Sequence, residues 1–127
     1  MNIIFLDDDY MINRFHELTL STMLREMGCS IEFHDDPTAL IEKCSDSNTC
    51  PDLIFLDINM PLMDGWSFMD AYNLKNPNVK TKFVILTTSN DPSYKERSNA
   101  YCNVIDFANK PLQKDKMKEI VEQIHVN

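Results

Sequence analysis

Residues 52–65 of this chain, DLIFLDINMPLMDG, constrain its fold more than any other stretch. The apolar run 53–56 ends in the carboxylate of Asp57, and the Asp64-Gly65 pair then marks a loop. A continuous apolar run of this length predicts a strand that is buried on both faces, as in a parallel sheet. Asp57 is therefore expected at the carboxyl end of a central strand, where open α/β sheets build their binding sites.

Similar runs recur along the chain at regular intervals. Short apolar or alternating runs predict further strands at about 3–6, 30–34, 83–86 and 104–107. Helical spacing and N-cap signals predict helices at about 10–27, 37–44, 66–75, 92–101 and 114–125. Short strands joined by helices imply right-handed crossovers. The chain is therefore expected to form an α/β fold in which a parallel five-stranded sheet carries helices on both faces.

Length and composition limit the possible functions. A chain of 127 residues has room for one domain, 1–127, and we expect no output domain. The net charge of −8 argues against a nucleic-acid-binding surface, which needs clustered Lys and Arg. The sequence shows neither an apolar run of membrane-spanning length nor a signal peptide, and its four scattered cysteines form no zinc pattern. These features favour a cytoplasmic protein without membrane or nucleic-acid partners.

Charged and hydroxyl side chains directly follow four of the predicted strands. In a parallel sheet the carboxyl ends of the strands lie on one edge, so these side chains should converge: Asp7, Asp8, Asp57, Thr87 and Lys110. At about 4 Å and an effective dielectric constant near 20, each repulsion between two carboxylates costs roughly 4 kcal/mol. One Lys cannot offset three carboxylates, whereas a hard divalent cation can. Oxygen ligands favour Mg²⁺, which is often bound together with a phosphate.

With these residues in place, the whole chain resembles the receiver domains of two-component response regulators. The resemblance rests on four motifs at matching positions: Asp7-Asp8 after the first strand, Leu56 to Gly65 around Asp57, Thr87 after the fourth strand, and Lys110-Pro111 after the fifth. Each motif alone is common, but the four together are specific. The resemblance implies a flavodoxin-like, doubly wound (βα)5 fold with strand order 2-1-3-4-5.

The resemblance also implies a reaction. Asp57 would be the phosphoacceptor, taking a phosphoryl group from a phosphohistidine on a sensor histidine kinase or a histidine phosphotransfer protein. Mg²⁺ would be held by Asp8, Asp57 and the backbone carbonyl of Asn59, with Asp7 acting through bound water. These roles fit phosphoryl transfer, in which the protein mainly positions the groups and neutralises the developing charge.

The remaining motif residues would couple the phosphoryl group to the rest of the domain. The resemblance implies that Lys110 pairs with one phosphoryl oxygen and that the Thr87 hydroxyl binds another. Phe107 would be the aromatic switch that turns inward when Thr87 moves. The Lys110-Pro111 peptide bond is expected to be cis.

Two residues depart from the usual family pattern. The position after Thr87 is usually very small, and here Thr88 is expected to narrow access to the phosphoryl site. Asn103 stands where the family often has Gly, and we expect it to tolerate the left-handed backbone conformation there. Neither departure affects the phosphoacceptor, metal or lysine positions.

Two other functions would use some of the same residues. A small Mg²⁺-dependent phosphatase of the haloacid dehalogenase group would also use Asp57 as nucleophile, but it needs a second Asp where this chain has Asn59, and it needs a substrate-covering cap. A degenerate receiver that only binds a partner would lack a site residue, and none is missing. We interpret the chain as a signalling module that catalyses only its own phosphorylation and dephosphorylation. Whether it ends a pathway or relays its phosphoryl group to a histidine phosphotransfer protein stays open.

A downstream protein partner is expected to read the phosphorylated state. The predicted helix from Ser93 to Tyr101 is short and polar, so it should bury little apolar surface and shift easily. Together with the strand that carries Phe107 and the closing helix, it is predicted to form the partner surface.

Overall fold

The computed structural model of the protein describes residues 1–78, 80–88 and 91–126. The side chains of Ser47, His125 and Val126 also lie outside the described part. The interpretation of His125 as a structural or exposed residue therefore falls outside it. Within the described residues, no helix has both the length and the apolar character needed to cross a membrane.

Five strands form a single parallel sheet. They are β1 (Asn2–Leu6), β2 (Ser30–His34), β3 (Leu53–Asp57), β4 (Lys82–Thr87) and β5 (Val104–Asn109). Their order across the sheet is β2-β1-β3-β4-β5, and all four neighbouring pairs are parallel. The central strand β3 is buried at every position, as its apolar run predicts. The predicted α/β fold and its strand order are confirmed.

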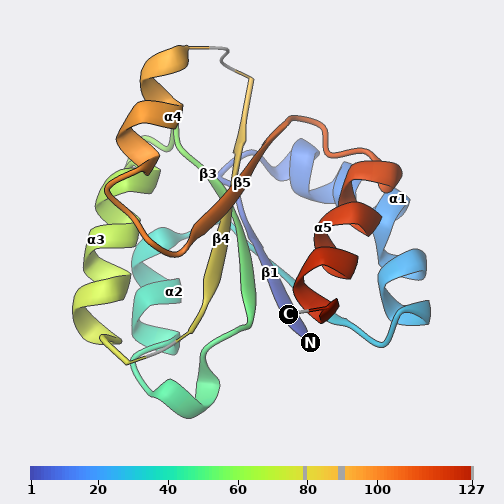
Figure 1. Cartoon of the computed structure of the whole chain (residues 1–127), viewed down its shortest axis with the longest axis horizontal. Helices are drawn as coiled ribbons and strands as arrows, with labels where there is room; N and C mark the ends of the chain where they lie inside the picture. The colour runs from blue at the N-terminus through green and yellow to red at the C-terminus, as the bar shows by residue number, and fades with distance from the viewer. Residues whose placement is uncertain (79, 89–90, 127) are drawn as a thin grey trace.

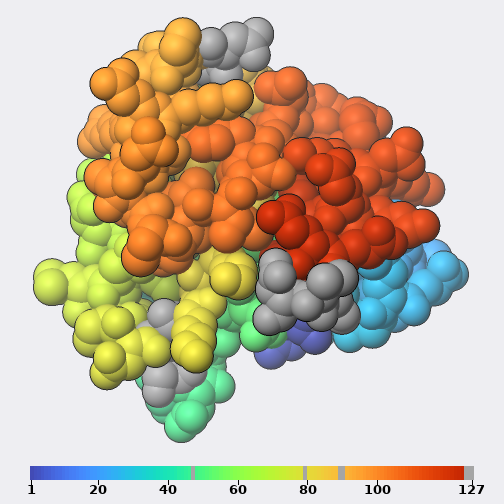
Figure 2. Space-filling view, in the orientation of Figure 1, coloured from blue at the N-terminus to red at the C-terminus, as the bar shows by residue number. Residues whose placement is uncertain are grey.

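The helices cover the sheet on both sides. They are α1 (Tyr10–Glu26), α2 (Pro37–Lys43), the short 3₁₀ helix η1 (Ser47–Thr49), α3 (Gly65–Lys75), α4 (Pro92–Ser98) and α5 (Lys114–Val126). Helices α1 and α5 lie on one face of the sheet, and α2, α3 and α4 lie on the other (Figure 1). Seen from the β5 edge, the orange to red surface of α4, β5 and α5 is continuous (Figure 2).

Aspartate side chains cap the start of five of these helices. Each accepts a hydrogen bond from a backbone N–H of the first turn, which satisfies a donor that a helix start leaves open; the five are Asp9, Asp36, Asp46, Asp64 and Asp91. At the other end of α1, Gly28 has a φ of 82°, the left-handed conformation that glycine adopts most easily. The predicted ends of the five strands and of α1 to α5 agree with the observed ends to within about three residues.

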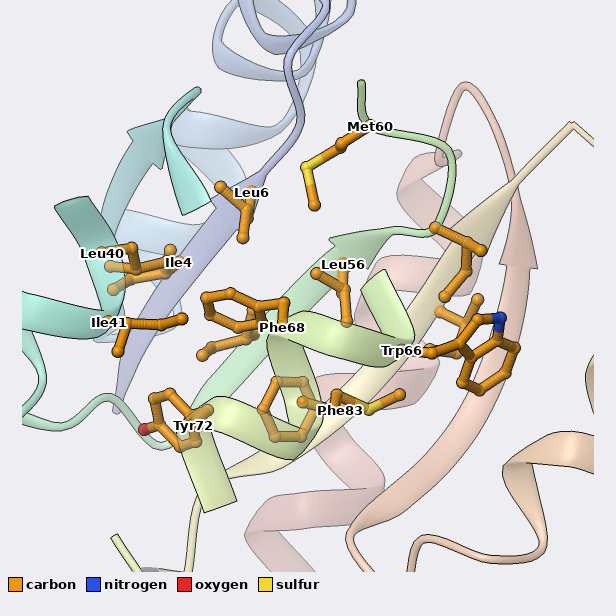
Figure 3. Close-up of a cluster of buried hydrophobic side chains, with 14 of the residues drawn as sticks. Ile4, Leu6, Leu40, Ile41, Leu56, Met60, Trp66, Phe68, Tyr72 and Phe83 are labelled. Carbon is orange, nitrogen blue, oxygen red and sulfur yellow. The ribbon is translucent and has the colours of Figure 1, made fainter. Parts of the chain in front are cut away.

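Two apolar clusters pack against the two faces of the sheet, because successive strand residues point to opposite sides. Ile4, Leu6, Leu56 and Phe83 face α2 and α3, where Phe68 and Tyr72 are fully buried (Figure 3). The alternate strand residues Ile3, Phe5, Leu53, Phe55, Val84 and Leu86 pack with α1 and α5. Full burial of such a side chain contributes about 1.5–3 kcal/mol, so both helix layers are firmly attached to β1, β3 and β4.

Two local expectations were wrong or incomplete. None of the described residues other than glycine has a positive φ, so Asn103 does not take the left-handed conformation. Its side-chain amide instead donates a hydrogen bond to Asn73 Oδ1 at 3.0 Å. On α1, the helical spacing of apolar residues predicts that Phe15 faces inward with Leu20 and Leu24, but Phe15 is 43% exposed, whereas Asn13 and His16 are buried. The inner face of α1 is thus more polar than its spacing of apolar residues suggests.

Candidate functional site

Asp57 is the last residue of β3, and its side chain is buried. Its residue surface is 3% exposed. The Oδ1 atom accepts a hydrogen bond from the Asn59 N–H at 3.2 Å and forms an ion pair with Lys110 Nζ at 3.0 Å. A buried carboxylate needs such partners because burial alone strongly disfavours its charge. Strand β3 thus places a reactive oxygen at the edge of the sheet and fixes its orientation.

The turn after β3 brings the chain back close to Asp57. The Gly65 N–H donates to the Ile58 carbonyl at 2.9 Å, and α3 begins there. A Cβ atom at Gly65 would lie 2.8 Å from the Asp57 carbonyl oxygen and 2.9 Å from Ile58 Cα, closer than backbone atoms tolerate. Glycine is therefore required here by space, and the Asp64-Gly65 signal in the sequence marks this close approach.

Two further carboxylates follow β1. Asp7 is buried, with 2% of its surface exposed, and Asp8 is exposed. Asp7 Oδ1 accepts from the Asp9 N–H at 2.9 Å, while its Oδ2 lies 2.6 Å from Lys110 Nζ. The Asn13 side-chain amide donates to the Asp7 backbone carbonyl at 3.0 Å. Asp7 is thus held at both its backbone and its side chain, and Asp8 points its charge to the open side.

Lys110 joins the two buried carboxylates. It follows β5, and its N–H donates to the Thr87 carbonyl at the end of β4 at 3.2 Å. Its side chain is only 10% exposed, with Nζ between Asp7 Oδ2 and Asp57 Oδ1. The Lys110-Pro111 peptide bond is cis, as predicted.

The charges at this edge do not balance. Burial and the nearby Asp7 charge raise the pKa of Asp57 to about 6, although Lys110 acts in the opposite direction. Burial on its own would lower the pKa of Lys110, but its hydrogen bonds and ion pairs with Asp7 and Asp57 outweigh burial and raise it. One ammonium therefore faces three carboxylates, and the site favours additional positive charge.

The oxygen atoms fit a divalent cation. One carboxylate oxygen from each of Asp7, Asp8 and Asp57 lies within 4.8 Å of the others. Two oxygens bound directly to one Mg²⁺ lie at most about 4.2 Å apart, because each Mg²⁺–oxygen distance is about 2.1 Å. Three carboxylate oxygens that lie within 4.8 Å of one another can therefore share one such cation, either directly or through bound water.

A hollow of about 330 Å³ opens over these groups. Its lining includes five of the six residues predicted for the chemistry, Asp7, Asp8, Asp57, Asn59 and Lys110, but not the sixth, Thr87. Thr88 also lines it, and its narrowing of access stays a prediction. The hollow brings carboxylate oxygens and the Lys110 ammonium together, the groups that can bind a metal ion and a phosphate.

Thr87 and Phe107 lie in a neighbouring hollow. Thr87 ends β4 and is 5% exposed, and Phe107 on β5 is half-buried. Both line a hollow of about 370 Å³ between β5 and the start of α4, together with Tyr94 and Lys95. The structure therefore brings Thr87 and Phe107 together, but around a different hollow from that of the three carboxylates.

Sequence reasoning missed two residues that support the site. Asn13 and His16 lie one turn apart on the inner face of α1, and both bind backbone groups beside the site. The available signal was their spacing with the buried Leu20 and Leu24, which puts all four on one helical face. Polar residues at inward positions require buried partners.

The fold is a parallel α/β sheet whose carboxyl edge carries a lysine and an acidic pocket of three carboxylates. The chain belongs to the response regulator receiver domain family, whose model matches residues 3–122. It is a receiver domain of two-component signalling.

Individual relatives agree with this assignment. The chain is 26% identical to protein PilG of Pseudomonas aeruginosa over 117 residues, which cover 92% of the chain and 82% of PilG. It is 27% identical over 121 residues to the transcription factor SKN7 of Chaetomium thermophilum, covering 95% of the chain but only 15% of that protein. The structure of a two-component response regulator from Cytophaga hutchinsonii matches with a TM-score of 0.81 at 22% identity, covering 99% of this chain and 97% of the other. That likeness shows the fold.

Proposed function

We propose that Asp57 is the phosphoacceptor of this receiver domain. One observation carries the proposal: the buried Asp57 carboxylate lies beside Asp7, Asp8 and Lys110 in one open hollow. The negative charge of this group favours a bound cation. A carboxylate oxygen of Asp57 attacks the phosphorus of a phosphohistidine. The N–P bond breaks, its electron pair returns to the imidazole, and an acyl phosphate forms on Asp57.

Each neighbouring residue has a part in this transfer. Asp8, Asp57 and the Asn59 carbonyl would hold Mg²⁺ directly, and Asp7 would hold it through water; the bound ion would neutralise the phosphoryl oxygens. Lys110 shifts from bridging two carboxylates to pairing with a phosphoryl oxygen. The domain therefore catalyses its own phosphorylation and dephosphorylation and turns over no metabolite.

The signal then passes through Thr87 and Phe107. The Thr87 hydroxyl binds another phosphoryl oxygen, and the movement of Thr87 lets Phe107 turn inward. Their shared hollow supports this coupling, because Tyr94 and Lys95 of α4 also line it. A phosphate can bias only those elements whose contacts change with it, and here these are α4 and β5.

The phosphoryl donor is a sensor histidine kinase or a histidine phosphotransfer protein, and the reader of the signal is a downstream protein. We place the reader's binding surface on α4, β5 and α5, which form one continuous face in Figure 2. Ser98 is the one buried residue of α4. Lys114 and Lys118 of α5 are exposed, and Lys116 is tied to Asp106 of β5 at 2.8 Å.

The acceptor can be tested without knowing the kinase. Phosphoramidate and Mg²⁺ should give one labile phosphoryl adduct per chain by intact-mass analysis. Asp57→Asn should abolish the adduct, because an amide is a poor nucleophile. Asp35→Asn, an exposed carboxylate away from the hollow, should leave it unchanged. An adduct that persists in Asp57→Asn would show that the acceptor is another residue.

A further inference from the structure

A histidine is enclosed in the core beneath the site. His16 on α1 is 0% exposed, and its ring centroid lies 5.1 Å from that of Phe5. Burial lowers the pKa of His16 to about 4, although the Asp7 charge acts in the opposite direction. The ring is therefore neutral near pH 7, and each ring nitrogen has a fixed role as donor or acceptor.

The ring makes one hydrogen bond in the described part of the chain, and it is a long-range one. His16 Nε2 accepts from the Leu112 N–H at 2.9 Å, across 96 residues of sequence. Because Nε2 accepts, the ring proton belongs on Nδ1, which is buried and has no hydrogen-bond partner among the described residues. A leucine would fill this space and remove the unpaired Nδ1–H, but it would leave the buried Leu112 N–H without its acceptor. The acceptor at Nε2 is therefore what distinguishes His16 from a packing residue.

The residue that His16 holds lies two positions after Lys110. Pro111, which lies between them, has no N–H, so the Leu112 N–H is the first backbone donor after Lys110. On the other side, the Lys110 N–H is held by the Thr87 carbonyl at 3.2 Å. Two backbone N–H groups of the short segment that carries Lys110 are thus held, one by a carbonyl of β4 and the other by the His16 side chain of α1.

We propose that His16 is a positioning residue for Lys110. By accepting the Leu112 N–H it fixes the backbone from which the Lys110 ammonium reaches Asp7 and Asp57, and it thereby sets the rate at which Asp57 is phosphorylated. The inference rests on the proposed function of Asp57. In this proposal α1 affects the reaction by positioning Lys110 and supplies no metal ligand of its own.

Three substitutions distinguish the effect of the hydrogen-bond acceptor at position 16 from the effect of the volume of the side chain. His16→Gln places an amide oxygen about where Nε2 lies, His16→Asn is too short to reach Leu112, and His16→Leu fills the space without an acceptor. Ser21→Ala is the matched control, because Ser21 is also buried on α1 and its hydroxyl has no hydrogen-bond partner among the described residues. Each variant is phosphorylated with phosphoramidate at saturating Mg²⁺, and its Mg²⁺ affinity is measured by calorimetry.

His16→Leu and His16→Asn should be phosphorylated about tenfold more slowly than the parent, since small misplacements of a positioned group cost up to about a hundredfold. Their Mg²⁺ affinity should change less than about twofold, because the metal ligands are held by other contacts. His16→Gln should recover most of the rate, and Ser21→Ala should match the parent. A parental rate in His16→Leu, or an equal loss in His16→Gln, would overturn the proposal.

The unmodified protein supplies an independent test if a variant does not fold. In protein labelled with ¹⁵N-histidine, NMR should show the His16 proton on Nδ1 and a coupling across the hydrogen bond between Nε2 and the Leu112 amide. A proton on Nε2 would show that His16 does not accept the Leu112 N–H and would overturn the proposal. If the parent is not phosphorylated on Asp57, the proposed function fails instead. The NMR result then shows whether the hydrogen bond between His16 and Leu112 exists.

Discussion

Helices α1 and α4 lie on opposite faces of the sheet, and they are attached in opposite ways (Figure 1). The 17-residue α1 is tied to the backbone beside the site by buried polar side chains, Asn13 to Asp7 and His16 to Leu112. The seven-residue α4 has a single buried residue. The α4 region also packs through two partly buried rings, Tyr94 and Tyr101, against the buried Trp66 ring of α3.

The difference indicates a division of labour. Buried hydrogen bonds with fixed geometry hold the reacting groups on the α1 side, where small displacements would slow the chemistry. Helix α4 itself buries only Ser98, so it can shift at a lower free-energy cost. A phosphoryl group on Asp57 would then leave α1 in place and change the population of α4 positions.

The largest effect on stability should come from Mg²⁺, which would act at the three carboxylates. A ligand that binds only the folded state at about 100 times its dissociation constant raises the free energy of unfolding by about 2.7 kcal/mol. Asp8→Ala should remove this gain, and Asp35→Ala should retain it. Urea denaturation with and without Mg²⁺ provides the measurement, and a free energy of unfolding that ignores millimolar Mg²⁺ would contradict the cation site.

A comparable or smaller effect should follow from the charge of Asp57 itself. Its pKa is raised from 3.8 to about 6, so the folded state holds the proton more tightly than the unfolded chain does. The stability that this group contributes is present below about pH 4 and is lost as pH rises through about 6. Without Mg²⁺, Asp57→Asn should therefore be more stable than the parent at pH 7 by about 1–3 kcal/mol.

This advantage of Asp57→Asn should shrink as the pH is lowered from 7 to 4, because the parent carboxylate then takes up its proton. Unfolding curves of both proteins across that range test the direction. A constant difference between them would mean that Asp57 is not the group that titrates.

The smallest effect is expected at α4. The Arg97 guanidinium lies 5.0 Å from the centre of the Trp66 ring, and such an exposed cation–π contact contributes about 0.5–1 kcal/mol. Arg97→Gln should lower global stability by no more than this, yet it should speed hydrogen exchange within α4. Lys95→Gln, which removes the same charge from the same helix, is the control. Equal changes in both variants would show that the contact with Trp66 does not hold α4.

The sequence predicted the strand ends well because those positions follow from local patterns. Apolar runs that end at Asp7, Asp57 and Thr87 reveal both the strands and the sheet edge that they share. The anchoring roles of Asn13 and His16 could not be predicted in this way, because each depends on a backbone partner distant in sequence. Nor does a local pattern show that Thr87 and Phe107 line a separate hollow from the carboxylates.

The division between α1 and α4 is tested most directly by hydrogen exchange with and without beryllofluoride, which mimics a phosphoryl group on Asp57. With Mg²⁺ present in both samples, beryllofluoride should change exchange mainly between Thr87 and Lys110, and exchange in the buried half of α1 should stay constant. In Thr87→Ala most of the change should be lost. If the changes appear along α1 instead, or if Thr87→Ala responds as fully as the parent, the division of labour between the two helices is wrong.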